Sequence, residues 1–185
     1  MKLNAQQLRH LPESETVKKL LAGPRQPIYF ILENIYDTYN IGGLFRLADA
    51  LNIEKIFLCG DMETPPNSKI TKASIGTYKI VPWEYCATTA AAIEKLRCQV
   101  TGKIQIVAVE QSDQSIPYYK ASYQLPLAFI FGNETFGILP ATLKIADQVV
   151  EIPMLGVNRS LNVIVSAAIV SYHAVMLKLD SNLPG

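Results

Sequence analysis

Six short runs of β-branched, aromatic and aliphatic residues recur along the chain, and several of them are apolar almost throughout. Near-continuous apolar character is typical of strands that are covered on both faces of a sheet. The runs span residues 27–33, 54–60, 78–83, 103–110, 126–132 and 148–154. Because helical patterns lie between them, the chain is expected to form an α/β fold whose mostly parallel sheet is flanked by helices.

Four segments between or after these runs are predicted to be helical. In residues 40–51 the apolar side chains recur at helical spacing and form one stripe, made of Leu44, Leu47, Ala48 and Leu51. Residues 88–98 are rich in strong helix formers, and residues 139–147 form a short candidate helix. The chain closes with a helix that is expected to begin near Ser160.

The length and composition suit a single globular domain. The 185 residues are 49% hydrophobic and 18% charged, which is an ordinary balance for a chain with a sizeable core. Residues 1–25 are more polar and are predicted to form an N-terminal helical arm and linker, which leaves residues 26–185 as the main domain. The formal net charge is only +1, so any RNA or DNA partner must be held by local patches.

Cysteine and histidine usage favours a reducing, cytoplasmic setting and disfavours a metal site. The three cysteines are odd in number and lack CxxC spacing, and the N-terminus has no apolar signal core. His10 and His173 lie far apart with no cysteine or acidic cluster around them, so a zinc site is not expected. The apolar segment 163–179 is interrupted by polar residues, which favours a buried or subunit-interface helix over a membrane span.

The candidate functional zone follows from the expected sheet. In open parallel sheets, ligands bind beyond the carboxyl ends of the strands. Three stretches occupy that position, namely residues 34–50, 132–137 and 152–162. Other well-known sites are not indicated, since the chain has no GxGxxG after its first strand, no GxxxxGK[ST] and no GxSxG.

In the first stretch, Asn40 is a candidate N-cap for a helix that Gly42 and Gly43 open. Arg46 lies roughly 150° around the helical wheel from the apolar stripe, so it points away from the core. Two interpretations of Arg46 stay open. In the first, Arg46 is a solvated residue that forms an ion pair with Asp49, one turn further along the helix. In the second, its guanidinium binds a phosphate group near the start of the helix.

The second stretch follows a buried strand. Gly132 and Gly137 permit a positive φ or a close approach of a ligand to the backbone. Asn133 and Glu134 then project from the end of the strand. A plain turn explains these residues about as well when the stretch is read alone, and its place at the strand end favours a ligand.

The third stretch precedes the last predicted helix. Ser160 or Asn158 is a good N-cap for that helix, so capping alone can explain Ser160. Asn162 would then lie inside the first turn, where asparagine is disfavoured. Its presence there suggests contact with another polar group.

Together and in this order, the three stretches resemble the three motifs of the SpoU/TrmH branch of the SPOUT superfamily, which comprises S-adenosylmethionine-dependent RNA ribose 2′-O-methyltransferases. The resemblance covers about residues 27–178. The first motif is matched by Asn40, Gly42, Gly43 and Arg46. The second, Gly-x-Glu-x-x-Gly, is matched by Gly132, Glu134 and Gly137. The third is matched by Ile152, Pro153, Met154, Gly156, Ser160, Leu161 and Asn162.

The resemblance implies a C-terminal trefoil knot, a homodimer whose site lies near the subunit interface, S-adenosyl-L-methionine as cofactor, and tRNA or rRNA as substrate. The residues implied to bind the cofactor are Gly132, Ile152, Leu161, Met154, Gly137 and Val109, with Glu110 as a further wall. The residues implied to serve catalysis are Arg46 beside the target ribose, Asn40 and Glu134 holding the motif loops, and Ser160 and Asn162 completing the site. Ile164 departs from the small polar residue of many relatives.

No separate RNA-binding domain is recognisable, so the RNA is expected to contact basic residues of the arm and body. The candidates are Arg9, Lys18, Lys19, Arg25, Lys69, Lys72, Lys79 and Arg159, for each of which a solvated surface role is the alternative. Two other functions stay open for the whole chain. It could be a non-catalytic RNA-binding protein with a relic cofactor site, or it could be a methyltransferase that acts on another acceptor or a different α/β nucleotide-binding enzyme.

Overall fold

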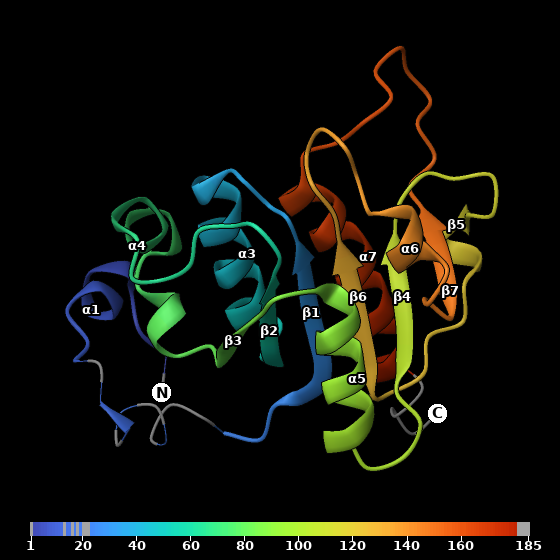
Figure 1. Cartoon of the computed structure of the whole chain (residues 1–185). Coiled ribbons are helices and arrows are strands. Elements are labelled where there is room, and N and C mark those ends of the chain that lie inside the picture. Colours follow the sequence, from blue (N-terminus) through green and yellow to red (C-terminus); the bar gives the residue numbers. More distant parts are fainter. Residues whose placement is uncertain (1, 13, 16, 18, 20–22, 181–185) are drawn as a thin grey trace.

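The computed structural model describes residues 2–12, 14, 15, 17, 19 and 23–180, and within them the chain forms one parallel β-sheet with helices on both faces (Figure 1). The strands are β1 (Gln26–Glu33), β2 (Ile53–Cys59), β3 (Trp83–Cys86), β4 (Gln105–Val109), β5 (Ile116–Pro117), β6 (Leu127–Phe131) and β7 (Gln148–Glu151). Their order across the sheet is β3-β2-β1-β6-β4-β7-β5, and each pair is parallel. The predicted α/β fold with a parallel sheet is therefore confirmed.

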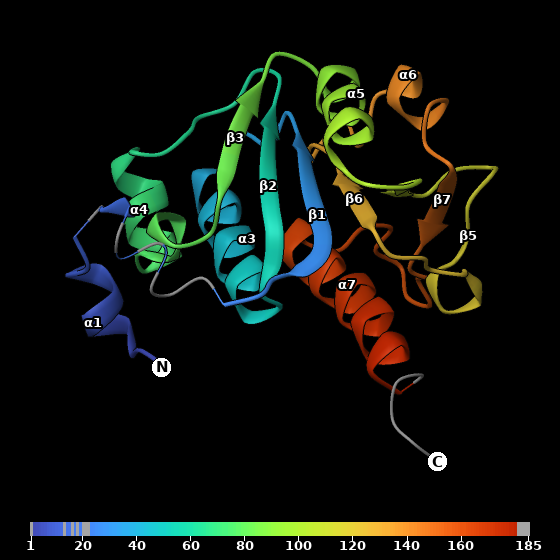
Figure 2. The same cartoon turned by 90° about the horizontal axis from the view of Figure 1, so that it is seen from below.

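The helices follow the strands in alternation. They are α1 (Ala5–Arg9), α3 (Thr38–Ala50), α4 (Ser68–Ser74), α5 (Thr89–Gln99), α6 (Pro140–Leu143) and α7 (Val163–Asp180), with short 3₁₀ helices η1 (Thr77–Lys79) and η2 (Tyr118–Lys120). Viewed from below, α3 and α7 cover one face of the sheet, while α5 and α6 cover the other (Figure 2). The two faces carry separate apolar cores.

The inner strands are nearly continuous in apolar character because both of their faces are buried. In β1, Phe30 and Leu32 pack into the core on the α3 side, while Ile31 between them packs into the core on the α5 side. The stripe predicted on α3 is also confirmed, since all four of its residues are buried against the sheet. Burial of such side chains contributes about 25 cal/mol per Å² of apolar area and is the main force that holds the helices on the sheet.

Two expectations about the elements are wrong. Residues 78–83 do not form one strand, because residues 77–79 turn as η1 and the strand begins only at Trp83. Tyr78 and Val81, three positions apart, both reach the core on the α3 side, and this spacing suits a helical turn better than an alternating strand. The last helix begins at Val163 and not near Ser160.

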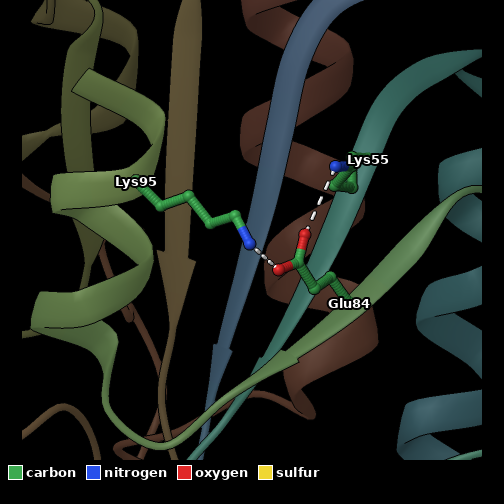
Figure 3. A network of polar contacts seen from close by, with 3 residues as sticks. All are labelled: Lys55, Glu84 and Lys95. Atoms are coloured by element: carbon green, nitrogen blue, oxygen red, sulfur yellow. Dashed lines mark hydrogen bonds and ion pairs between the residues drawn. The ribbon is translucent and has the colours of Figure 1, made fainter. Parts of the chain in front are cut away.

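A charged network joins the edge strand β3 and its neighbour β2 to α5 (Figure 3). Glu84 on β3 accepts a hydrogen bond from Lys95 on α5 and a 3.4 Å bond from Lys55 Nζ on β2. The hydrogen bond from Lys95 holds the pKa of Glu84 below its usual range. Because the three side chains are partly exposed, this network adds only modestly to stability.

The N-terminal arm contacts the body through backbone carbonyl groups. Lys79 Nζ donates to the carbonyl oxygens of Arg9 and Leu11, at 3.2 and 2.9 Å. A Cβ atom on Gly76 would lie 2.5 Å from the carbonyl oxygen of Leu8, so the glycine permits this close approach of α1. The division of the chain at residue 25 stays a prediction.

Within the described residues, no helix is long and apolar enough to cross a membrane. Within that same part of the chain, no three histidine, cysteine or acidic side chains gather into a group that could hold a metal ion.

Candidate functional site

A cavity of about 230 Å³ opens at the carboxyl edge of the sheet, beyond the ends of β4, β6 and β7. All six residues implied to bind the cofactor line it, and so do Glu134 and Ser160. Its wall also includes residues that the sequence did not single out, namely Gln111, Phe131, Thr135, Glu151, Val163 and Ser166. Two of the three predicted stretches therefore meet at one cavity.

The glycine-bracketed stretch forms a tight loop on one wall of this cavity. Asn133 and Gly137 pair across the loop through two backbone hydrogen bonds of 3.1 and 2.9 Å. Gly137 has a φ of +68°, which only glycine adopts readily. A Cβ atom on Gly132 would lie 2.4 Å from the carbonyl carbon of Gly137, so the two glycines let the strands of the loop touch. The turn interpretation of this stretch is therefore confirmed, and the ligand interpretation stays a prediction.

Asn40 does not cap α3, contrary to expectation. The cap is Asp37, whose side chain accepts a 2.8 Å hydrogen bond from the Tyr39 amide. Asn40 is instead buried in the first turn of the helix, where its Nδ2 donates to Glu134 Oε1 at 2.8 Å. A buried amide needs such partners, because an unsatisfied polar group costs about 1–3 kcal/mol.

The cap of α7 is likewise a different residue from the one predicted. Asn162 Oδ1 accepts from the Ile164 amide at 2.9 Å, and its carbonyl oxygen accepts from the Ser166 amide at 3.0 Å. These bonds put Asn162 at the N-cap, a position that asparagine favours. Ser160 lies before the helix, where its amide donates to Asn158 Oδ1 at 3.3 Å.

The expected polar contact of Asn162 is present. Its Nδ2 donates to Asn40 Oδ1 at 3.0 Å, so a chain of side-chain hydrogen bonds runs from Asn162 through Asn40 to Glu134. This chain links all three predicted stretches. Asn40 and Asn162 thus lie behind the cavity wall that Glu134 helps to form.

The paired glycines of α3 serve close packing inside the helix. A Cβ atom on Gly42 would lie 2.4 Å from Ala73 Cβ and 2.8 Å from the backbone nitrogen of Ser74, both on α4. A Cβ atom on Gly43 would lie 2.3 Å from the Cδ1 atom of Ile164 on α7. Ile164, the departure from the family pattern, thus fills the space beside Gly43.

Arg46 lies on the exposed face of α3 and does not belong to the cavity wall. Among the described residues it has no hydrogen-bond or ion-pair partner, and the considered pairing with Asp49 is absent. Asp49 lies near Arg25 instead, where burial raises the pKa of the carboxyl group and the positive guanidinium opposes that rise. The charge of Arg46 is therefore free for an external group.

Three carboxylates face the cavity, from Glu110, Glu134 and Glu151. Glu151 Oε2 accepts from the Ser115 hydroxyl at 2.9 Å. Apolar side chains of Val109, Ile152 and Leu161 form other parts of the wall. A cavity with apolar walls, open glycine backbone and an excess of carboxylates suits a ligand that combines a flat apolar ring with a positive charge.

Glu33, which ends β1, is a supporting residue that the sequence analysis did not single out. Its side chain is buried and accepts hydrogen bonds from the Leu139 amide and the Thr142 hydroxyl at the start of α6. It thereby anchors the segment that follows the glycine loop. The signal in the sequence is an acidic residue at the end of an otherwise apolar strand.

The basic residues proposed for RNA divide into two groups. Arg25 donates to the carbonyl oxygens of Ile53 and Ile80, at 3.0 and 2.7 Å, and Lys79 holds the arm, so both have structural roles. The exposed candidates are Arg9, Lys19, Lys69, Lys72 and Arg159. Lys18 lies outside the described residues.

Comparison with known proteins adds three kinds of likeness. The model of the SpoU rRNA Methylase family matches residues 27–172. A 23S rRNA (guanosine-2′-O-)-methyltransferase of Vibrio parahaemolyticus is 28% identical over 163 residues, which are 88% of this chain and 64% of that protein. A tRNA (guanosine(18)-2′-O)-methyltransferase of Escherichia coli is 28% identical over 159 residues, 84% of this chain and 66% of that protein.

Among solved structures, an AdoMet-bound rRNA methyltransferase from Sinorhizobium meliloti is 25% identical and superposes with a TM-score of 0.75. The match covers 92% of this chain and 60% of that one. The chain thus spans less than two thirds of the length of these relatives.

Proposed function

The chain belongs to the SpoU rRNA Methylase family, and on that premise we propose that it transfers a methyl group from S-adenosyl-L-methionine to a ribose 2′-hydroxyl of tRNA or rRNA. The observation that carries the proposal is the chain of hydrogen bonds from Asn162 through Asn40 to Glu134, because it joins the three motif stretches beside one cavity. Both tRNA and rRNA stay open as substrates, since the two relatives are named for one each.

The residues of the cavity fit this cofactor. Val109, Ile152 and Leu161 offer apolar surface for the adenine ring, and the loop closed by Gly132 and Gly137 offers backbone groups for its edge. The carboxylate of Glu151, which among the described residues has a hydrogen-bond partner on only one of its oxygens, favours the positive charges of the sulfonium and amino groups. When bound, the cofactor supplies a methyl group on a good leaving group, so the protein has to supply alignment and help with the hydroxyl proton.

Arg46 is the residue proposed to meet the ribose. Its guanidinium is charged at all relevant pH values, so its role is to orient the ribose and to stabilise negative charge that develops on the 2′-oxygen. Asn40, Glu134 and Asn162 hold the loops around the cavity, and Ser160 completes the wall. Exposed Arg159, beside the cavity, is a candidate phosphate contact.

A homodimer, a C-terminal trefoil knot and a cytoplasmic location are parts of the same proposal. The last helix exposes Val165, Tyr172 and Met176 at helical spacing, with 40 to 45% of each side chain accessible, and this stripe gives a second copy apolar area to cover. Since Arg46 lies outside the cavity of its own chain, a subunit interface near α3 would complete the site. The knot is supported by family membership.

The test is transfer of radiolabelled methyl from S-adenosyl-L-methionine to unmodified tRNA and, separately, to rRNA, followed by nuclease mapping. The expected result is label in a 2′-O-methyl nucleotide of one RNA class, and no label with Arg46→Ala. Cofactor binding without label in either RNA would reject the proposal and favour a relic site or another acceptor.

A further inference from the structure

Glu110, directly after β4, is tied to the end of the glycine loop, and both line the cavity. Its Oε2 accepts a 2.8 Å hydrogen bond from the amide of Ile138, and its Oε1 accepts a 2.9 Å bond from the amide of Gln111. The backbone of Glu110 is itself fixed, because its amide donates to the carbonyl oxygen of Val150 on β7 at 2.9 Å. Both carboxylate oxygens are therefore occupied by backbone amides.

The carboxylate of Glu110 also explains why the last position of the second motif, Gly137, is a glycine. A Cβ atom on Gly137 would lie 2.3 Å from Glu110 Oε2 and 2.9 Å from its carboxyl carbon. Any side chain at this position would displace the carboxylate as well as strain the positive φ. The absence of a side chain at Gly137 thus leaves the space that the Glu110 carboxylate needs to reach the Ile138 amide.

Gln111 makes the corresponding contact with the third motif stretch. Its Nε2 donates a 2.7 Å hydrogen bond to the carbonyl oxygen of Arg159, which lines the same cavity. Two neighbouring residues at the end of one rigid strand therefore hold two loops that are separate in the sequence. Residues of both loops line the cavity assigned to the cofactor.

We propose that Glu110 and Gln111 form a brace that sets the distance between the two cofactor loops and thereby the affinity for S-adenosyl-L-methionine. This inference rests on the proposed function. Both are positioning residues, since they act through Ile138 and Arg159. The competing role for Glu110 is direct attraction of the sulfonium charge, and its two occupied oxygens argue against that role.

The test compares, by titration calorimetry, the affinity for S-adenosyl-L-methionine with that for its product S-adenosyl-L-homocysteine, which lacks the sulfonium charge. Glu110→Ala removes the acceptor for the Ile138 amide and is expected to weaken both ligands equally, roughly tenfold, as suits one hydrogen bond to a charged group. Glu110→Gln keeps one acceptor oxygen for the Ile138 amide but turns an NH₂ group towards the Gln111 amide, so it should weaken both ligands equally and by less than Glu110→Ala does. Gln111→Ala is expected to weaken both ligands severalfold.

Gln114→Ala is the matched control, because Gln114 is exposed in the same loop and its side chain is not part of the brace. Amide exchange of Ile138, followed by NMR in the unliganded protein, supplies a readout that does not depend on the cofactor. It should be faster in Glu110→Ala and near the wild-type rate in Glu110→Gln.

Loss of affinity for S-adenosyl-L-methionine alone in Glu110→Gln would overturn the brace and assign Glu110 to the sulfonium. Unchanged affinities in folded Glu110→Ala and Gln111→Ala would overturn it as well, as would failure of the wild-type protein to bind either ligand. If Glu110→Ala does not fold, the affinities of Glu110→Gln and Gln111→Ala decide between the brace and direct attraction of the sulfonium charge. Binding by the wild type without methyl transfer to RNA would remove the proposed function and leave the brace standing.

Discussion

Asn40 and Glu134 lie 94 positions apart in the chain, yet the amide nitrogen of one donates a 2.8 Å hydrogen bond to the carboxylate of the other. The oxygen of the same amide accepts from Asn162 at 3.0 Å. A single buried side chain thus uses both ends of its amide to hold two loops. An ionised aspartate or a lysine could not make both contacts, because a carboxylate only accepts hydrogen bonds and an ammonium group only donates them.

Replacing this amide should cost stability. Among the described residues, Asn40→Ala leaves Glu134 with only the 3.4 Å contact from the Tyr36 amide, and it leaves Nδ2 of Asn162 without its acceptor. The free energy of unfolding is expected to fall by about 1–3 kcal/mol in urea titrations. Asn158→Ala, which removes an exposed amide from a neighbouring loop, should cost less. Equal losses in the two variants would contradict a linking role for Asn40.

Arg46→Ala should separate turnover from folding and from cofactor binding. Because the side chain is exposed and has no polar partner among the described residues, the melting temperature and the calorimetric affinity for S-adenosyl-L-methionine should stay near wild type. The rate of methyl transfer should fall roughly 10²–10³-fold, the usual loss for a group that stabilises developing negative charge. Arg97→Ala, an exposed arginine on α5, should change none of the three. A large loss of cofactor affinity in Arg46→Ala would place the arginine in the cofactor site.

The sequence predicted those features that depend on periodicity. Phe30, Ile31 and Leu32 are apolar in succession because two cores lie on either side of β1, and a continuous apolar run is the signature of that arrangement. Because the strand ends where this apolar run ends, the residues that follow it lie at the carboxyl edge of the sheet. The location of the candidate site could therefore be predicted before any contact was known.

What failed was the assignment of capping and polar contacts. Asn40 and Asn162 both suit an N-cap, and propensity cannot tell which asparagine caps and which is buried. The difference is made by tertiary partners, namely Glu134 for one and the start of α7 for the other. The contacts of Glu110 were equally invisible, because they involve backbone amides, which every residue except proline carries.

The two glycines of α3 should differ sharply on substitution. Gly42→Ala puts a methyl group against Ala73 Cβ and the backbone of Ser74, which cannot rotate away, so a loss of about 1–3 kcal/mol in unfolding free energy is expected. Gly43→Ala meets only the end of the Ile164 side chain, which can turn aside, and alanine gains about 1 kcal/mol of helix propensity. Gly43→Ala should therefore stay within about 1 kcal/mol of wild type. Similar losses in both variants, measured by urea titration, would refute this packing argument.

Cys59 should make the protein less stable in mild alkali. Burial raises the pKa of this fully buried thiol to about 12, whereas a thiol in an unfolded chain ionises near pH 8.5. Above about pH 8.5 the unfolded chain loses a proton that the folded chain keeps, so stability should fall by up to roughly 1.4 kcal/mol per pH unit towards pH 12. Urea titrations between pH 7.5 and 10 measure this slope, below the range in which Tyr123, whose pKa burial also raises, contributes.

The matched variants for this slope are Cys59→Ala and Cys98→Ser. Cys59→Ala should be less stable at pH 7.5 but should lose less on the way to pH 10, because Cys86, whose pKa burial also raises, is then the one buried thiol left of the three cysteines. Cys98 is exposed, so Cys98→Ser should keep the wild-type slope. A Cys59→Ala slope equal to that of the wild type would mean that the alkaline loss arises elsewhere in the core.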